Sequence, residues 1–345
     1  MTFISADPGA VALQRRRASR RTSLTIALLA GLTAALFVIT LVVGQTVTPI
    51  DEVLAVLLGD EVPGTGFLVG TLRLPRAVLS LLVGTSFGLG GVTFQIMLRN
   101  PLASPDIIGI SSGASVAAVF AIVVLALNGP IVSVFAVTAG LAIALLIYAL
   151  SFRDGVVGSR LILIGIGVAS MLQSATAYIL SIAPAWSLQE SIRWITGSVN
   201  GARLEQALPV AAALLVFGTI LIRLSRDLAL LRLGEDAASA LGVRVELTRI
   251  LAIVAAVGLI AFATAATGPI AFVAFLSGPI AARIVGPGSV LVPAALVGAI
   301  LVLAGDYAGQ QLLPSRYPVG VVTGALGAPY LIYLLIRSNR GKGMA

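Results

Sequence analysis

The feature that most constrains this chain is a series of long apolar runs that recurs from about Ser23 to Ile336. An α-helix crosses the bilayer core, about 30 Å thick, with about 20 apolar residues. Hydrophobic residues make up 58% of the chain and charged residues only 10%, which leaves too few polar side chains to cover a soluble core of this size. No polar block long enough for a second domain interrupts the runs. The sequence therefore predicts one all-α integral membrane domain.

The runs divide, at charges and at Gly/Pro clusters, into about ten predicted transmembrane helices. Their approximate ranges are 24–46, 75–98, 107–127, 131–151, 161–182, 207–224, 248–267, 271–285, 290–308 and 318–337. The eighth is short and contains Gly278-Pro279, which predicts a broken or partial helix. Small residues crowd the second span at 84–91 and the start of the third at 109–115, which predicts close helix packing or a pathway lined by small and hydroxyl side chains.

The basic residues predict how the chain is oriented. Ten spans place both termini on one side, and 17 of the 22 Lys and Arg residues lie on that side. Because basic loops remain in the cytoplasm, both termini are predicted to be cytoplasmic. The expected organisation is a basic N-terminal segment at 1–22, a transmembrane domain at 23–337 with a cytoplasmic segment at about 225–247, and a tail at 338–345.

The residue inventory excludes several kinds of chemistry. The chain has no Cys and no His, and Lys342 is its single lysine. It therefore lacks thiolate nucleophiles, imidazole bases, zinc ligands of those types and the lysine of a phosphate-binding P-loop. We expect no catalytic residue, no metal site and no cofactor bound by this chain. The net charge of +8 resides in short loops between apolar runs, so we expect no nucleic-acid partner.

A set of motifs in a fixed order resembles the FecCD permease family, the membrane subunits of ABC importers for ferric siderophores, haem and cobalamin. The motifs are Arg-Leu-Pro-Arg at 73–76, Gln95, and the segments 99–105, 109–114, 194–198, 233–242, 268–273, 318–324 and 327–329. The resemblance implies the type II ABC importer architecture in the bacterial cytoplasmic (inner) membrane. It also implies a second permease subunit, identical or paralogous, two ATP-binding subunits that carry ATP and Mg, and a substrate-binding protein. The cargo that it implies is a metal chelate, for which we expect a ferric siderophore.

The cytoplasmic segment around Glu235 has the pattern of a short capped helix, with acids at its start and Gly242 after its end. From the residues alone, an ordinary capped connector is the favoured interpretation, and a helix that docks into a groove on a soluble partner is the alternative. The resemblance implies that it couples the permease to the ATPase, through Leu233, Gly234, Glu235, Asp236, Ala237, Ala238, Leu241 and Gly242.

Three outer arginines form a second candidate set. Arg73, Arg76 and Arg316 are predicted on the outer face, where arginines commonly meet lipid headgroups. The resemblance implies instead that they dock the binding protein. Candidate pathway or structural residues are Gln95, Ser111, Ser112 and Asp306.

Asp306 is the one acid well inside a predicted span, and we expect it to be hydrogen-bonded within the helix bundle. Two rival functions are an ion-coupled secondary transporter and a membrane-embedded enzyme. The first needs carboxylates or His near the bilayer midplane, and the second needs a nucleophile, a base or a metal cluster. The sequence offers few residues that could serve either function.

Overall fold

The computed structural model describes residues 8–105, 109–151, 158–286 and 288–342, and within these ranges the fold is helical throughout, with no β-strand. The elements are α1 (Pro8–Val42), α2 (Ile50–Leu58), η1 (Gly66–Arg73), α3 (Leu74–Met97), α4 (Ile110–Val123), α5 (Pro130–Ser151), α6 (Gly158–Ser181), α7 (Ala185–Thr196), α8 (Leu204–Ala213), η3 (Leu214–Gly218), α9 (Thr219–Arg223), α10 (Ser225–Leu231), α11 (Glu235–Ala240), α12 (Val245–Thr267), α13 (Val273–Val285), α14 (Leu291–Tyr307), η4 (Ala308–Leu312) and α15 (Val319–Lys342), in which the η segments are π-helical. The first seven residues of the predicted N-terminal segment and the last three of the tail lie outside the described residues.

Seven helical stretches of the described chain are long and apolar enough to cross a membrane. They are Arg20–Val42, Gly66–Met97, Pro130–Ser151, Arg160–Ser181, Leu204–Arg223, Val245–Thr267 and Leu291–Leu312. Three shorter apolar helices, Ile110–Val123, Val273–Val285 and Val319–Leu334, coincide with the other three predicted spans. The membrane fold is confirmed, whereas the count of ten spans stays a prediction because these three fall short of the usual spanning length.

Helix α3 is the buried centre of the bundle and packs against α12, α13 and α14. Its glycines allow backbones to touch: a Cβ added at Gly84 would lie 2.5 Å from the carbonyl oxygen of Gly298, and one at Gly91 would lie 1.9 Å from that of Ala274. Any larger residue would force the helices apart. The close packing predicted for 84–91 is therefore present, and it fixes α3 against its neighbours.

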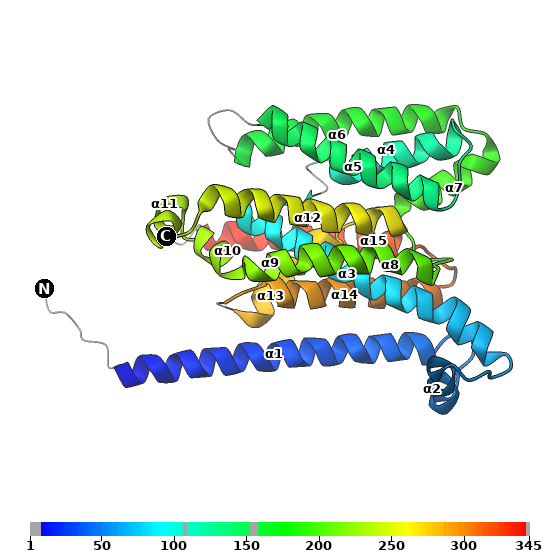
Figure 1. The fold of residues 1–345 in the computed structure, drawn as a ribbon, viewed down its shortest axis with the longest axis horizontal. Coiled ribbons are helices and arrows are strands. Elements are labelled where there is room, and N and C mark those ends of the chain that lie inside the picture. Colours follow the sequence, from blue (N-terminus) through cyan, green and yellow to red (C-terminus); the bar gives the residue numbers. More distant parts are fainter. Residues whose placement is uncertain (1–7, 106–108, 152–157, 287, 343–345) are drawn as a thin grey trace, which may run out of the picture.

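The remaining helices form layers on either side of this centre (Figure 1). Helices α4, α5, α6 and α7 pack together, and α4 and α5 contact α12, while α1 runs along the opposite side against α14. The start of α1, helix α11 and the end of α15 lie at one end of the bundle, and α2 and α7 lie at the other. This arrangement agrees with the prediction that both termini are on one side.

Two of the segments between predicted spans contain helices of their own. The loop 47–74 contains α2 and η1, and the loop 183–206 contains α7. Because η1 continues into α3, the second span begins at Gly66 rather than at about residue 75. The eighth span is short as predicted: α13 has 13 residues and contains Pro279.

Candidate functional site

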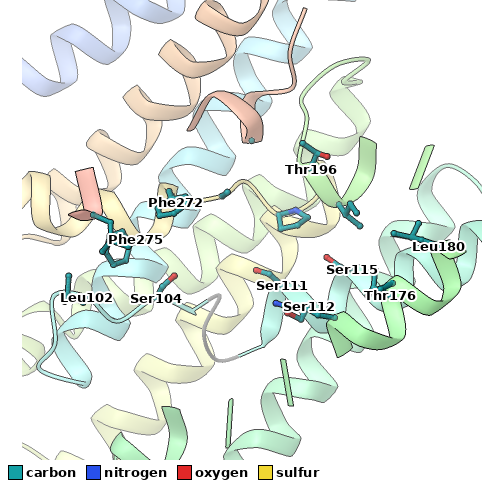
Figure 2. Close-up of a pocket in the computed structure, with 17 residues that line it drawn as sticks. Leu102, Ser104, Ser111, Ser112, Ser115, Thr176, Leu180, Thr196, Phe272 and Phe275 are labelled. Carbon is teal, nitrogen blue, oxygen red and sulfur yellow. The ribbon is translucent and has the colours of Figure 1, made fainter. Parts of the chain in front are cut away.

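A cavity of about 900 Å³ lies between the helical layers and is the first candidate site (Figure 2). Hydroxyl side chains from α4 and α6 face it. Opposite them is an aromatic wall that consists of Phe272, just before α13, and Phe275 of α13. None of its described lining residues is charged. The lining residues are Leu102, Ser104, Ser111, Ser112, Ser115, Gln173, Thr176, Ala177, Leu180, Ile195, Thr196, Pro269, Ala271, Phe272, Phe275, Gly320 and Leu331.

The serines reach this cavity because of where α4 starts. Gly109 has a left-handed backbone with a φ of 84°, and α4 begins at the next residue. Ser111 and Ser115 are four residues apart and so share one helix face, with Ser112 beside them. The structure thus places both predicted pathway serines, Ser111 and Ser112, at one cavity and adds Ser115.

Three of the motifs that are far apart in the sequence meet at the rim of this cavity. The backbone N–H of Ser198 donates to the carbonyl of Thr267 at 2.7 Å, and that of Gly320 donates to the carbonyl of Gly197 at 3.1 Å. A Cβ added at Gly320 would lie 1.8 Å from the carbonyl oxygen of Thr196. The motifs at 194–198, 268–273 and 318–324 are therefore parts of one backbone junction.

The aromatic wall was not predicted from the sequence. Phe272 has a φ of 65°, an unusual conformation for a bulky residue, and its ring meets that of Phe275 edge to face with centroids 6.1 Å apart. The available signal was the Gly268-Pro269 break ahead of a short span, which exposes the following side chains to a cavity.

Gln95 supports this wall from behind and does not line the large cavity. Its Nε2 donates to the carbonyl oxygen of Phe275 at 2.9 Å, and its side chain is buried. A Cβ added at Gly278 would lie 1.9 Å from its Oε1, so the glycine makes room for the amide. Gln95 is therefore a positioning residue for Phe275. It also lines a second cavity of about 290 Å³ together with Arg99 and Arg232.

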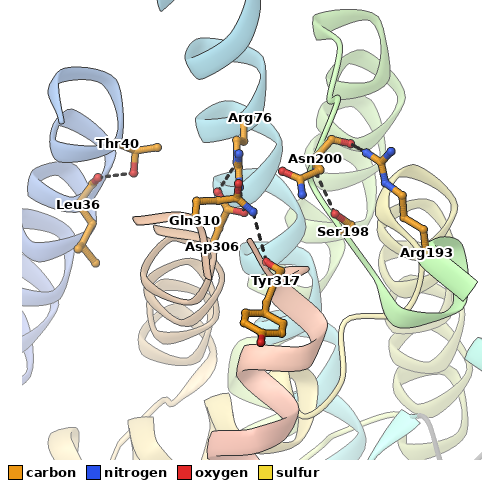
Figure 3. Close-up of polar contacts among 9 residues, drawn as sticks. All are labelled: Leu36, Thr40, Arg76, Arg193, Ser198, Asn200, Asp306, Gln310 and Tyr317. Carbon is orange, nitrogen blue, oxygen red and sulfur yellow. Dashed lines mark hydrogen bonds and ion pairs between the residues drawn. The ribbon is translucent and has the colours of Figure 1, made fainter. Parts of the chain in front are cut away.

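Asp306 forms a buried ion pair with Arg76 (Figure 3). The Nε of Arg76 donates to Oδ2 at 2.5 Å and its Nη2 donates to Oδ1 at 2.6 Å, which is a bidentate geometry. The pair joins α3 to α14. The expectation that Asp306 is hydrogen-bonded within the bundle is confirmed, and its partner is one of the arginines predicted to dock a protein.

Arg73 has a different environment from Arg76. Its guanidinium is buried and donates to the carbonyls of Leu41, Val42 and Thr46 and to the hydroxyl of Thr48, at 2.8 to 3.1 Å. Leu41 and Val42 are the last two residues of α1 and the two threonines follow it, so Arg73 holds the end of α1 and the chain after it against the start of α3. This geometry argues against a docking role for Arg73, because a buried guanidinium bound to four acceptors has no surface to offer a second protein.

Arg316 lies exposed at the end of the bundle that carries α7 (Figure 1), where it lines a cavity of about 530 Å³ with Arg76 and Arg193. The Nη2 of Arg193 donates to the carbonyl of Asn200, and Gln310 donates to that of Tyr317 at 3.2 Å (Figure 3). Docking of another protein by Arg76 and Arg316 stays a prediction.

The predicted coupling segment forms a short exposed helix, α11. The helix lies between two glycines that have a positive φ, Gly234 at 119° and Gly242 at 85°. Leu233 and Leu241 are 67% and 56% exposed, which leaves them available to a partner. Ala238 is fully buried and therefore cannot touch a partner.

Glu235 is engaged within the chain. Its Oε1 accepts a hydrogen bond from the Nη2 of Arg249 on α12 and lies 3.6 Å from the Nη2 of Arg99, just after α3. The carboxylate therefore ties α11 to two membrane helices. Besides Glu235, the exposed members of the predicted coupling set are Asp236, Ala237, Gly242 and the two leucines.

Comparison with known proteins identifies the family. Residues 32–337 match the model of the FecCD transport family. The chain belongs to this family. The resemblance read from the motifs is therefore confirmed, and the chain is a multi-pass membrane permease of an ABC transporter, a type of protein that works with a partner permease and ATPase subunits.

Its relatives include two siderophore permeases. The chain is 39% identical over 304 residues to the ferric enterobactin permease protein FepG of Escherichia coli, covering 87% of this chain and 91% of that one. It is 38% identical over 332 residues to the achromobactin permease protein CbrC of Dickeya dadantii, covering 94% and 95%. A solved transporter assigned to the metal-chelate ABC type, in an inward-facing conformation, matches this FecCD fold with a TM-score of 0.79 and 27% identity over 91% of this chain and 99% of that one.

Proposed function

We propose that this FecCD permease forms half of the membrane pore of an ABC importer and that its cargo is a ferric siderophore. The observation that carries the proposal is the uncharged cavity of about 900 Å³, lined by serine and threonine hydroxyls and by Phe272 and Phe275. A cavity of this kind offers a bulky chelate many weak contacts and no strong one. Weak, distributed contacts suit a cargo that must leave as readily as it enters. The siderophore permeases among its relatives support the same class of cargo.

The rest of the importer follows from this assignment. The proposed assembly contains a second permease subunit, identical or paralogous, two ATP-binding subunits that hold ATP and Mg, and a substrate-binding protein at the outer face. It resides in the bacterial cytoplasmic (inner) membrane, with the basic segment 1–22, the segment 225–247 and the tail 338–345 in the cytoplasm. In this proposal the chain itself binds no cofactor and performs no covalent chemistry.

Coupling to the ATPase is proposed to run through α11. Leu233 and Leu241 offer apolar contact to the ATPase subunit, while Glu235 holds the helix to α12 and to the end of α3. A displacement of α11 would therefore be passed to α3, whose Gln95 is bonded to the cavity residue Phe275.

The rival function of an ion-coupled transporter finds little support in this geometry. Asp306 is the acid within the spans that such a mechanism would use, and its two carboxylate oxygens are both bonded to Arg76. A carboxylate held in this way by a permanently charged guanidinium is poorly placed to exchange protons or bind a second cation.

The cavity proposal is tested by filling the space. Ser115→Trp places a large ring in the cavity, whereas Leu145→Trp, at an exposed position on α5, is the matched control. We expect Ser115→Trp to reduce uptake of radioiron-labelled siderophore at least tenfold in cells that express the complete importer, with unchanged membrane levels and ATPase assembly. The Leu145→Trp variant should import normally. Normal uptake by a well-expressed Ser115→Trp variant would exclude this cavity as the path.

A further inference from the structure

A groove of about 400 Å³ lies away from the transport cavity, between the outer ends of α5, α8 and α12. Its walls are mainly apolar and include Val134 and Val137 of α5, Pro209 of α8 and Phe262 of α12. Along α5 the groove extends from Pro130 to Thr138, which corresponds to a depth of about 12 Å at 1.5 Å per residue. That depth spans the headgroup level and the first part of the hydrocarbon core.

Charged side chains of both signs occur at one end of the groove. Arg203 and Glu205 line it at the start of α8, and both are exposed. Neither forms an ion pair with the other, or with any other residue that the structure describes. The Oε1 of Gln206, next to them, accepts a hydrogen bond from the backbone N–H of Arg203 at 2.9 Å.

Pro209 leaves a backbone carbonyl without its helical hydrogen-bond donor near this end. Proline has no backbone N–H, so the carbonyl of Glu205, four residues earlier, lacks the donor that an uninterrupted helix would supply. The mouth of the groove thus presents a guanidinium, a carboxylate and a carbonyl within one helical turn, above an apolar channel that opens to lipid.

We propose that this groove binds a phospholipid whose headgroup combines a phosphate with a primary ammonium, as in phosphatidylethanolamine. The phosphate pairs with Arg203, the ammonium donates to the carboxylate of Glu205, and an acyl chain lies along Val134, Val137 and Phe262. The charge pattern favours this headgroup over two others. A purely anionic headgroup would meet the negative charge of Glu205, and a quaternary choline has no N–H to donate to it.

The test measures lipid retention directly. The full-length permease, purified with its partner subunits and stripped of lipid, is offered phosphatidylethanolamine, phosphatidylcholine and phosphatidylglycerol with identical acyl chains, and bound lipid is counted by native mass spectrometry. We expect the wild-type chain to retain phosphatidylethanolamine about tenfold better than phosphatidylcholine, the ratio that one charge-assisted hydrogen bond supplies.

Variants assign this preference to the groove. Glu205→Gln should remove the preference for phosphatidylethanolamine over phosphatidylcholine, and Arg203→Gln should lower retention of all three lipids. Glu246→Gln, an exposed acid at the opposite end of α12, is the matched control and should change nothing. Val137→Trp should block the groove, and the Glu205→Gln variant keeps the test informative if the tryptophan impairs folding.

The opposite outcomes are distinct. Equal retention of the three lipids would mean that the groove takes any acyl chain, and the proposal would be wrong. Preferential retention of phosphatidylglycerol would make the mouth an anion site and would also overturn it. A preference that survives Glu205→Gln would place the lipid elsewhere on the protein.

Discussion

Arg73 and Arg76 are three residues apart in one motif, yet the fold gives them separate tasks. Arg73 donates to carbonyls at the end of α1 and just after it, and Arg76 donates to the carboxylate of Asp306 on α14. Each guanidinium therefore fastens α3 to a different neighbour. Positions three apart in an α-helix lie only about 60° from each other around the axis, so the two side chains differ in their partners rather than in the helix face that they occupy. The shared motif reflects packing at the outer start of α3 at least as much as contact with another protein.

The ion pair between Arg76 and Asp306 is predicted to stabilise the bundle strongly. Asp306→Asn would leave the charge of Arg76 without its partner in a largely buried site, and the loss of one member of a buried pair costs about 3 kcal/mol or more. We expect a clearly lower unfolding midpoint for the purified permease. A double-mutant cycle with Arg76→Gln should show that the double variant loses less stability than the sum of the single variants.

Asp60→Asn, at an exposed acid after α2, is the control for this measurement and should leave the midpoint unchanged. Additive effects of Arg76→Gln and Asp306→Asn would show that the two side chains are not coupled, contrary to the geometry described above.

At the scale of single elements, α11 is held to the helix bundle on one side and leaves apolar side chains exposed to a partner on the other. Ala238 faces inward, Glu235 holds Arg249, and Leu233 and Leu241 remain exposed. A substitution meant to test partner contact must therefore avoid Ala238, because a carboxylate there would enter the apolar core beneath the helix.

Leu241→Asp is the sharper test of coupling. It places a charge on the exposed side of α11 without disturbing the core, so we expect the ATPase subunit to co-elute poorly and siderophore uptake to fall while permease levels stay normal. Leu58→Asp, at an exposed leucine on the outer helix α2, should retain the ATPase. Full co-elution and uptake with Leu241→Asp would remove this leucine from the coupling contact.

The elements differ in how far the sequence could predict them. The apolar runs predicted the membrane helices and the glycines at 84–91 predicted close packing of the second span, because both follow from local residue size and hydropathy, but only the structure shows that α14 is a partner of α3. The pair between Arg76 and Asp306 spans 230 positions, and no local pattern indicates which distant side chain completes it. The aromatic wall escaped prediction for a related reason: the left-handed conformation of Phe272 depends on the junction of three separate motifs.

At the scale of the whole molecule, the sites are arranged along one axis. The cavity with Arg76 and Arg316 lies at the end that carries α7, the predicted outer end, and α11 lies at the opposite end (Figure 1). Between them, α3 is continuous from Arg76 to Gln95, so one buried helix connects the outer ion pair, the residue behind the aromatic wall and, through Arg99, the coupling helix. A rigid central helix with glycine contacts on several sides is well suited to carry a displacement from one face to the other.

The orientation of this axis rests on the distribution of basic residues and can be tested by cysteine labelling, since the chain has no natural cysteine. Ser239 on α11 and Ser315 after η4 are both exposed and lie at opposite ends, whereas Ser187 is fully buried and would be a poor reporter. With an impermeant thiol reagent on intact cells, Ser315→Cys should react and Ser239→Cys should not. Permeabilised cells supply the control, because there the Ser239→Cys variant should react as well. Labelling of that variant in intact cells would reverse the predicted orientation and would place α11 on the side away from any cytoplasmic ATPase.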